Sequence, residues 1–314
     1  MGEQIIKAAA STGANAVKFQ NYRTEDFLSD KTLTYRYVVD GHSKEQSQFD
    51  LFKQCEMSYE DLVAYRKTAE YFGLDFISTP TSMRGVDDLV SIDAAAIKNG
   101  SDFLGNLPLL KHMANSGLPT IVSTGMATAE EIDEAVGCFP GQKPILLHCI
   151  SMYPAPMSEL NLLKIPTLAS ATGCLTGYSD HSLGSQSAAL ATALGACVIE
   201  KHFTLDHALP GPDHSMSTTP QEMAELVRSI REAEMALGSS QLAPAAGEAH
   251  SRDQYRLSCV ADRNLSAGTV VAENDIVYHR PGGGIKPAEA GSLVGRKLGH
   301  AVDRGHLFKW SDFQ

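Results

Sequence analysis

The sequence predicts an α/β protein, a (β/α)8 TIM-type barrel followed by a small, mixed, β-rich domain. Short apolar runs alternate with helical segments along most of the 314 residues, an order that is typical of parallel sheets. Most of these runs stop at polar or small residues, as barrel strands do at their active-site face. Beyond residue 238 the alternation stops, and short β-like pieces with glycine and proline turns take its place.

Seven apolar runs have the length and composition of buried strands, and a helix fragment at residues 3–13 precedes the first. The strand cores are Ala16–Phe19, Phe76–Ser78, Ala94–Ile97, Thr120–Val122, Ile145–Leu147, Cys174–Thr176 and Ala196–Ile199. The predicted helices are Tyr59–Phe72, Leu107–Ser116, Thr128–Val136, Gln186–Leu194 and Pro220–Leu237. Because a complete barrel has eight strands, we expect a barrel that lacks its first strand. A doubly wound open sheet is the alternative, but no strand precedes a glycine-rich dinucleotide fingerprint.

The barrel domain is predicted to span residues 1–238, a linker residues 239–255 and the small domain residues 256–314. The linker follows from a stretch of small and polar residues without hydrophobic periodicity. The β-like pieces of the small domain are Leu257–Val260, Thr269–Val271 and Ile276–His279. With about 60 residues this domain is near the lower limit of independent stability, so we expect it to pack on a partner surface.

The composition limits the class of function. A net charge of −11 argues against a nucleic-acid partner. No apolar run reaches the roughly 20 residues that a membrane-spanning helix needs, and the first residues show no secretory signal. Six scattered cysteines without a C-x-x-C pair favour reduced thiols. We therefore expect a cytoplasmic protein with neither a membrane nor a nucleic-acid partner.

Two histidines follow neighbouring predicted strands. His181 ends the motif GYSDH after one apolar run, and His202 lies in EKHF after the next. A small-residue helix between the runs makes a strand–helix–strand unit, so the two strands lie parallel and side by side. The two imidazoles would then meet at one rim and bind a metal with water or substrate in the remaining positions. Mn²⁺, or another divalent ion such as Mg²⁺ or Co²⁺, suits this better than closed tetrahedral zinc. Two packed or surface histidines are the alternative.

Basic and hydroxyl side chains gather at the same predicted rim. Lys18 and Lys98 stand at the ends of two strands. Hydroxyl groups stand at four other strand ends, on Thr79, Ser101, Ser123 and Ser179. Two ammonium groups and a ring of hydroxyls facing one pocket predict a site for phosphate or carboxylate, whereas solvated surface lysines are the alternative. A metal beside an anion site indicates an enzyme that polarises a carbonyl of a small phosphorylated or carboxylated substrate.

Nine short motifs occur along the chain in a characteristic order. They are VKFQ (17–20), FISTP (76–80), KNGSD (98–102), STGM (123–126), LLHC (146–149), GYSDH (177–181), EKHF (200–203), PGPDH (210–214) and RPGGG (280–284). Single motifs are weak, but all nine in this order cover almost the whole chain. On these motifs the chain resembles the N-acetylneuraminate (sialic acid) synthase family, including its legionaminate-type members.

The resemblance implies a transferase that condenses phosphoenolpyruvate with N-acetylmannosamine or a related acylated hexosamine. The products would be phosphate and a nine-carbon 2-keto sugar acid. The resemblance also implies a C-terminal antifreeze-like (SAF) domain and a domain-swapped homodimer, in which each SAF domain caps the partner's barrel.

The resemblance also implies roles for individual residues. His181 and His202 look like the Mn²⁺ ligands, Gln20 and Asp213 look like sugar contacts, and Arg280 would reach the sugar in the other subunit's site. The implied catalytic residues are Lys18, Lys98, Tyr153, Glu200 and Arg280. The implied substrate-binding residues are Gln20, Thr79, Ser101, Ser123, Ser151, Ser179 and Asp213.

The chain departs from the family pattern at a few places. Family members begin with a strand carrying Glu-Ile-Gly-x-Asn-His, whereas this sequence begins in the helix that follows it. Ser151 stands where Asn often occurs, and Asn99 replaces an apolar residue. Asp102 and Phe103 stand where many members have Gly-Glu. These differences concern the choice of sugar more than the chemistry of phosphoenolpyruvate.

Three other functions stay open at this point. A legionaminate-type synthase would use a 2,4-diacetamido-6-deoxy-mannose sugar. Another barrel synthase acting on a sugar phosphate would need a further basic site, which the sequence does not clearly offer. The absent first strand leaves open an inactive, truncated remnant that only binds a ligand.

Overall fold

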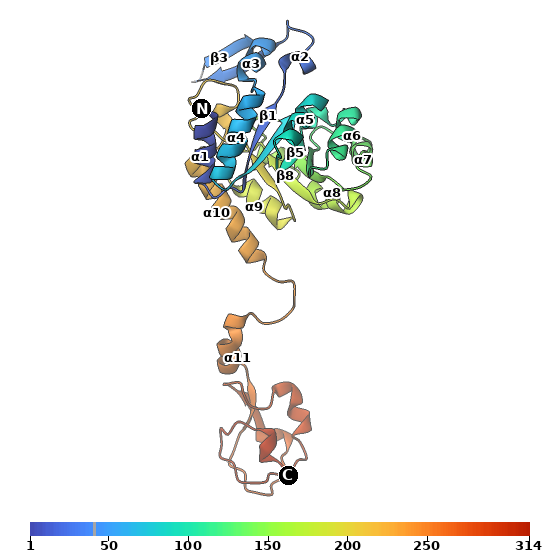
Figure 1. Cartoon of the computed structure of the whole chain (residues 1–314). Coiled ribbons are helices and arrows are strands. Elements are labelled where there is room, and N and C mark those ends of the chain that lie inside the picture. The colour runs from blue at the N-terminus through green and yellow to red at the C-terminus, as the bar shows by residue number, and fades with distance from the viewer. Residues whose placement is uncertain (40–41) are drawn as a thin grey trace. The chain divides into compact units, whose positions relative to one another are not determined.

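The computed structural model describes residues 1–39 and 42–314. The chain forms two compact units, Met1–Gly238 and Ser239–Gln314, and each is described by itself (Figure 1). No helix of the described residues is long and apolar enough to cross a membrane.

Seven strands of the first unit form one parallel sheet, so the predicted α/β class is confirmed for the described residues. The strand order is β1-β4-β5-β6-β7-β8-β9, which places β1 and β9 at the two edges. The strands are β1 (Ala16–Asn21), β4 (Asp75–Pro80), β5 (Ala96–Asn99), β6 (Thr120–Ser123), β7 (Ile145–Cys149), β8 (Thr176–Asp180) and β9 (Ile199–Lys201). The sheet is curled, and Figure 1 shows helices wrapped around it.

The helices of this unit pack around the sheet, and several of them begin after a capping residue. They are α1 (Gly2–Ala10), α4 (Tyr59–Tyr71), α5 (Met83–Ser91), α6 (Leu107–Asn115), α7 (Ala129–Gly137), α8 (Lys164–Thr172), α9 (Gln186–Ala193) and α10 (Pro220–Leu237). Ser58, Thr128 and Thr219 each form a capping box with the acidic residue three positions later. These boxes fix the first turns of α4, α7 and α10. Helices α5 and α8 were not predicted from the sequence.

A β-hairpin lies between β1 and α4, where no strand is predicted from the sequence. Strands β2 (Thr34–Val39) and β3 (His42–Ser47) pair antiparallel, and the short helices α2 (Thr24–Phe27) and α3 (Gln48–Cys55) flank them. The hairpin was missed because β3 carries mostly polar residues. Tertiary packing overrides such weak local preference for strand.

Alternation along the strands sorts side chains between the two faces of the curled sheet. Val17, Phe76, Ile97, Val122 and Leu146 join the core that packs against the helices. Their strand neighbours Ala96, Ile121 and Leu147 form a separate cluster on the other face. Because successive side chains alternate, every second residue near the strand ends points toward the concave interior.

The C-terminal unit has its own small apolar core. It contains helix α11 (Ala249–Tyr255) and the antiparallel pair β10 (Ser258–Ala261) and β11 (Ile276–His279). Leu265, Leu293 and Phe308 are buried at its centre. Two details differ from prediction. The predicted linker 239–255 includes helix α11, and the predicted strand Thr269–Val271 is reduced to a single bridge between Val270 and Lys297.

Candidate active site

The polar residues predicted at the strand ends lie at the carboxyl rim of the sheet. Strand β8 spans Thr176–Asp180, so the strand predicted at 174–176 exists but its predicted boundaries were wrong. The reason is Gly177, which reads as a turn residue in the sequence. A Cβ at this position would meet the Val198 carbonyl and come within 2.6 Å of Leu147 Cδ2. Glycine is therefore required inside the strand, where the interior is crowded.

One carboxylate joins the two predicted lysines. Glu200 Oε1 lies 3.2 Å from Lys18 Nζ, and Glu200 Oε2 lies 3.2 Å from Lys98 Nζ. The lysines come from β1 and β5, whereas Glu200 comes from β9, so the bridge crosses the concave face of the sheet. The Lys98 and Glu200 side chains are only 8% and 17% exposed. Lys18, Lys98 and Glu200 thus form a net positive cluster in a partly desolvated part of the concave interior. This cluster is called the cationic hollow below.

Burial and neighbouring charge act against each other in this cluster. Burial on its own would raise the pKa of Glu200, but Lys98 and Lys18 hold it well below its usual range. Burial lowers the pKa of Lys18, and the Glu200 carboxylate opposes that change. Glu200 is therefore ionised near neutral pH. Its carboxylate therefore pairs with both lysine side chains at the place where an anion would bind.

Several of the predicted hydroxyl groups are buried beside this cluster. Thr79 and Ser123 are 2% and 1% exposed, and neither hydroxyl has a hydrogen-bond partner within the described chain. Ser179 is also buried, and its Cα pairs with that of Glu200 across β8 and β9. A buried hydroxyl without a partner is costly, so Thr79 and Ser123 are ready to bond a polar ligand.

Gly125 brings two further predicted serines together. Its amide donates a 3.0 Å hydrogen bond to Ser101 Oγ. A Cβ at Gly125 would lie 2.5 Å from Ser151 Oγ and 2.7 Å from Ser101 Oγ. The backbone of the loop after β6 is therefore held close to both hydroxyls, and a larger residue would displace them.

His181 is held in one orientation at the end of β8. Its Nδ1 donates a 2.8 Å hydrogen bond to the Ile150 carbonyl, which leaves the Nε2 lone pair free. The residue is 7% exposed, and burial lowers its pKa. The imidazole is therefore neutral near pH 7, the form in which histidine binds metals.

His202 lies next to His181, as the strand–helix–strand pattern predicts. The two ring centroids are 5.4 Å apart, and the rings are inclined by 73°. Burial lowers the pKa of His202 to about 4, although the Asp213 carboxylate 3.6 Å away opposes this. Tyr153 covers the pair, with its ring centroid 4.2 Å from that of His181 and 5.9 Å from that of His202.

The two remaining predicted site residues are Gln20 and Arg280. Gln20 is exposed on β1, and its Cα pairs with that of Thr79 on β4. Arg280 belongs to the C-terminal unit, where its guanidinium lies 5.2 Å from the centroid of the Tyr255 ring.

One polar rim residue faces the other way. His148 lies in the motif LLHC at the end of β7, where alternation along the strand turns it to the helix side of the sheet. There its Nε2 donates a 2.6 Å hydrogen bond to the Leu160 carbonyl, and the ring is 1% exposed. His148 thus supports the packing of the segment before α8. Its strand neighbour Cys149 faces the site instead, with Sγ 3.8 Å from His181 Nδ1.

A buried network behind His181 was missed by the sequence reasoning. Asp180 Oδ2 accepts hydrogen bonds from Lys201 Nζ and Ser187 Oγ, each 2.8 Å long. Asp180 Oδ1 accepts from the Ser182 amide and hydroxyl. The network ties β8, β9 and the start of α9 together directly beside both histidines. In the sequence, this network is indicated only by Asp180, which directly precedes His181 in the motif GYSDH.

The histidine pair fits a divalent metal ion. The His181 Nδ1 proton is engaged by a backbone carbonyl, both rings are neutral near pH 7, and they stand close together. Two nitrogen ligands leave further positions for water and oxygen atoms of a substrate, as Mn²⁺ and Mg²⁺ prefer.

A curled parallel sheet with two lysines and a histidine pair at its carboxyl rim is the arrangement of an α/β enzyme whose site lies at that rim. The NeuB family model matches residues 5–242 of the chain. The chain therefore belongs to the NeuB family.

Two curated relatives match nearly the full length of the chain. An N,N'-diacetyllegionaminic acid synthase from Legionella pneumophila is 36% identical over 100% of this chain and 90% of its own length. N-acetylneuraminate-9-phosphate synthase from Homo sapiens is 31% identical over 95% of this chain and 84% of its own length. An N-acetylneuraminic acid synthetase from Leptospira borgpetersenii, solved in complex with citrate, superposes with a TM-score of 0.71. It is 34% identical, and the match covers 80% of this chain and 84% of that one.

Proposed function

We propose that this protein condenses phosphoenolpyruvate with an acylated mannosamine-type sugar, forming a nine-carbon 2-keto sugar acid and releasing phosphate. The observation that carries the proposal is the Lys18–Glu200–Lys98 bridge beside the His181–His202 pair. An anion site next to a metal site is what this reaction requires, because one substrate is an enol phosphate and the other an aldehyde.

Phosphoenolpyruvate would bind in the cationic hollow. Lys18 and Lys98 would form charge-assisted hydrogen bonds to its phosphate and carboxylate, with Ser101, Ser123, Ser179 and Thr79 supplying further donors. The unpaired hydroxyls of Thr79 and Ser123 support this assignment. Glu200 would hold the two ammonium groups apart in the geometry that the anion needs.

The sugar would bind on the histidine side of the hollow. Gln20, Tyr153, Ser151 and Asp213 would contact its hydroxyl and acylamino groups. His181 and His202 would hold Mn²⁺ or a similar ion, which supplies Lewis-acid polarisation of the open-chain sugar aldehyde when bound.

The reaction would then proceed with the substrates held face to face. The enol carbon of phosphoenolpyruvate attacks the aldehyde carbon, and a carbon–carbon bond forms. The aldehyde oxygen takes up a proton as its π bond opens, and water adds at C2 of the resulting cation and gives up a proton. The C2–O bond to phosphate then breaks, the C2 hydroxyl loses its proton to become the ketone, and Lys18 and Lys98 stabilise the departing phosphate. Glu200 lies within reach of both lysines and would keep both ammonium groups oriented during this step.

The test is phosphate release from phosphoenolpyruvate by the 314-residue chain. N-acetylmannosamine and the 2,4-diacetamido-6-deoxy-mannose sugar are each supplied, with Mn²⁺ and with EDTA. Release that requires both a sugar and a metal supports the proposal, and the faster sugar identifies the acceptor. A chain that stays folded and binds phosphoenolpyruvate, yet releases no phosphate with either sugar, would point instead to a ligand-binding remnant.

We further propose that the curled sheet is a (β/α)8-type barrel, that the C-terminal unit is a SAF domain, and that two chains exchange these domains in a dimer. Support comes from the exposed Arg280, which lies on a unit separate from the cationic hollow. In that arrangement Arg280 would contact the sugar of the partner chain. Arg280→Ala and Lys98→Ala chains, each impaired on its own, should regain part of the activity when they are mixed, because one site of each mixed dimer is intact. A verified mixed dimer without activity would refute the exchange.

A further inference from the structure

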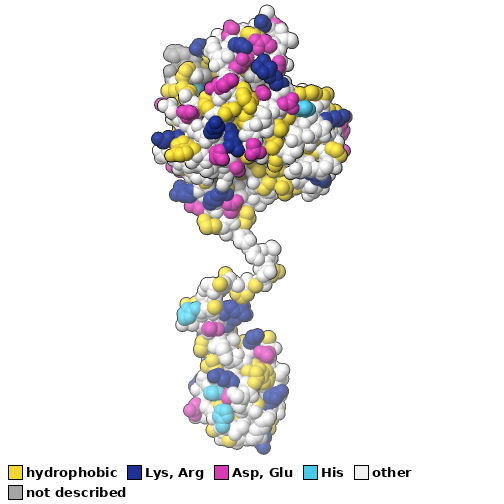
Figure 2. Space-filling view, viewed as in Figure 1, with side chains coloured by type: hydrophobic (Ala, Val, Ile, Leu, Met, Phe, Trp, Pro, Cys, Tyr) yellow, Lys and Arg dark blue, Asp and Glu magenta, His cyan; other side chains and the backbone are white. Residues whose placement is uncertain are grey.

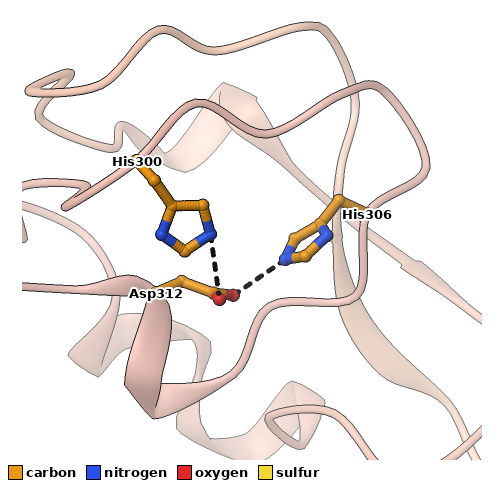
Figure 3. A group of neighbouring side chains, drawn as sticks. All are labelled: His300, His306 and Asp312. Atoms are coloured by element: carbon orange, nitrogen blue, oxygen red, sulfur yellow. Dashed lines mark hydrogen bonds and ion pairs between the residues drawn. The ribbon is translucent and has the colours of Figure 1, made fainter.

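We propose that His300, His306 and Asp312 of the C-terminal unit form a binding site for a divalent transition-metal ion of the zinc class. This site shares no residue with the proposed active site, and its existence does not depend on the proposed function. Figure 3 shows both imidazole rings turned toward the carboxylate of Asp312.

The ligand atoms are already close to a coordination geometry. His306 Nε2 lies 2.9 Å from Asp312 Oδ2, and His300 Nε2 lies 3.5 Å from Asp312 Oδ1. One ligand atom from each residue lies within 4.8 Å of those from the other two. In a tetrahedral zinc site with bonds near 2.0–2.1 Å, neighbouring ligand atoms are about 3.3 Å apart. Small rotations of the two histidine side chains would reach that spacing.

The backbone fixes the three ligands to one another. The Gly299 amide donates a 2.8 Å hydrogen bond to the Asp312 carbonyl, which joins the segment of His300 to the last turn of the chain. The His306 carbonyl accepts a 3.0 Å hydrogen bond from Ala261 of β10. The Asp312 carboxylate also accepts a 2.7 Å hydrogen bond from the Lys309 amide. The ligands are therefore presented by an ordered framework, which lowers the cost of binding a metal.

The carboxylate of the three side chains is buried, whereas the two imidazoles are open to solvent. The Asp312 side chain is 6% exposed, whereas those of His306 and His300 are 34% and 55% exposed. Figure 2 shows histidine side chains at the visible surface of this unit. An ion can therefore enter from solvent on the histidine side and meet a shielded carboxylate beneath.

The donor set selects the class of ion. Two imidazole nitrogens and one carboxylate are ligands that zinc, cobalt and nickel accept, whereas magnesium and calcium prefer oxygen alone. Three protein ligands leave one position for water. Since the unit has a small core, an ion joining residues 300, 306 and 312 would stabilise it against unfolding.

The experiment measures zinc bound to the full chain by equilibrium dialysis and elemental analysis. The measurement is made in a chain that carries His181→Ala and His202→Ala, called the background chain, so that the histidine pair of the first unit cannot bind the zinc. We expect about one zinc per chain there, and its loss when His300→Ala and His306→Ala are added. The control His250→Ala, an exposed histidine of α11, should keep the zinc. Asp312→Asn, which preserves the shape of the side chain, should weaken binding on the order of 10-fold or more.

Two further measurements keep the outcome independent of folding in the background chain. In the otherwise unchanged chain, His300→Ala/His306→Ala should lower the bound zinc by one equivalent and abolish the visible absorption of four-coordinate Co²⁺. Excess Zn²⁺ should raise the unfolding midpoint of the C-terminal unit by about 5 °C, and the double variant should not respond. Unchanged zinc stoichiometry in the folded double variant, or a background chain that binds none, would overturn the proposal.

Discussion

Both units of this protein place two histidines near a carboxylate, but they do so by different means. In the first unit His181 and His202 follow adjacent strands, and their ring centroids are 5.4 Å apart. In the C-terminal unit His300 and His306 lie on irregular segments, with ring centroids 6.4 Å apart. The first pair follows from the geometry of a parallel sheet. The second pair depends on the tertiary folding of irregular segments in the small C-terminal unit.

Burial separates the two histidine pairs further. Burial lowers the pKa values of His181 and His202, and backbone or carboxylate partners orient both rings. His181 is 7% exposed and the His300 side chain 55%, whereas the His202 and His306 side chains are both 34% exposed. In the C-terminal unit the carboxylate between the rings is the buried group. An oriented pair with lowered pKa values suits catalysis, whereas a pair over a buried carboxylate suits a structural ion.

Among the changes that test this difference between the two histidine pairs, the loss of a histidine in the first unit should have the largest effect, which is on turnover. His202→Ala should reduce metal-dependent phosphate release on the order of 100-fold or more, because one of two proposed metal ligands is lost. The far-UV circular dichroism should stay unchanged. His112→Ala, a partly exposed histidine of α6, serves as the matched control and should retain activity. Retained turnover in folded His202→Ala would show that burial on strand ends does not make this pair catalytic.

A somewhat smaller effect is expected at the cationic hollow. Lys98→Ala removes one of the two ammonium groups that Glu200 bridges. Since a hydrogen bond to a charged group contributes about 1.5–3 kcal/mol, the KM for phosphoenolpyruvate should rise about 10- to 100-fold. Initial rates over a range of phosphoenolpyruvate concentrations measure this. Lys67→Ala, on the exposed side of α4, should leave KM unchanged, and an equal effect of both changes would contradict the site assignment.

The rigidity of the rim of the curled sheet is tested by Gly177→Ala. The new Cβ would meet the Val198 carbonyl and Leu147, and crowding of this kind costs typically about 1–3 kcal/mol in the free energy of unfolding. Denaturant unfolding followed by circular dichroism gives that value. A Cβ at Gly137 in α7 would meet nothing within 4 Å, so Gly137→Ala is the control and should not destabilise the unit. Equal stability of the two variants would mean that the sheet relaxes at no cost.

The smallest effect concerns a buried histidine that lies outside both clusters. Burial lowers the pKa of His148, and the charge of Lys164 acts in the same direction. The unfolded chain therefore binds a proton more readily, so stability should fall as the pH drops below about 6.5, by up to about 1.4 kcal/mol per pH unit. The contribution is fully present above that pH. His148→Gln keeps a donor for the Leu160 carbonyl but cannot titrate.

Urea unfolding at two pH values separates this contribution from those of the other histidines. Between pH 7.5 and 5.5 the unchanged chain should lose about 1 kcal/mol more stability than His148→Gln. The exposed His250→Ala chain should lose as much as the unchanged one. If His148→Gln shows the same pH dependence as the unchanged chain, the buried ring does not carry the effect.

Much of the first unit could be predicted because its signals are periodic. The run Ile145–Leu147 and the helix Pro220–Leu237 were placed closely, since apolar alternation and capping boxes act locally. Strand β8 was misplaced because Gly177 and Ser179 are poor strand formers, and only crowding in the curled interior makes them suitable. The hairpin β2–β3 was missed because its polar residues carry little strand preference.

The sequence by itself determined the α/β class and the pairing of His181 with His202, because parallel neighbours end at the same rim whatever the details of packing. It also placed Lys18 and Lys98 at strand ends. Only the tertiary structure decided that Glu200 bridges these lysines across the sheet, and that His148 turns away while Cys149 turns inward. The group of His300, His306 and Asp312 likewise emerged only from folding. Contacts across a curled sheet or between irregular segments depend on long-range packing, and no local period encodes them.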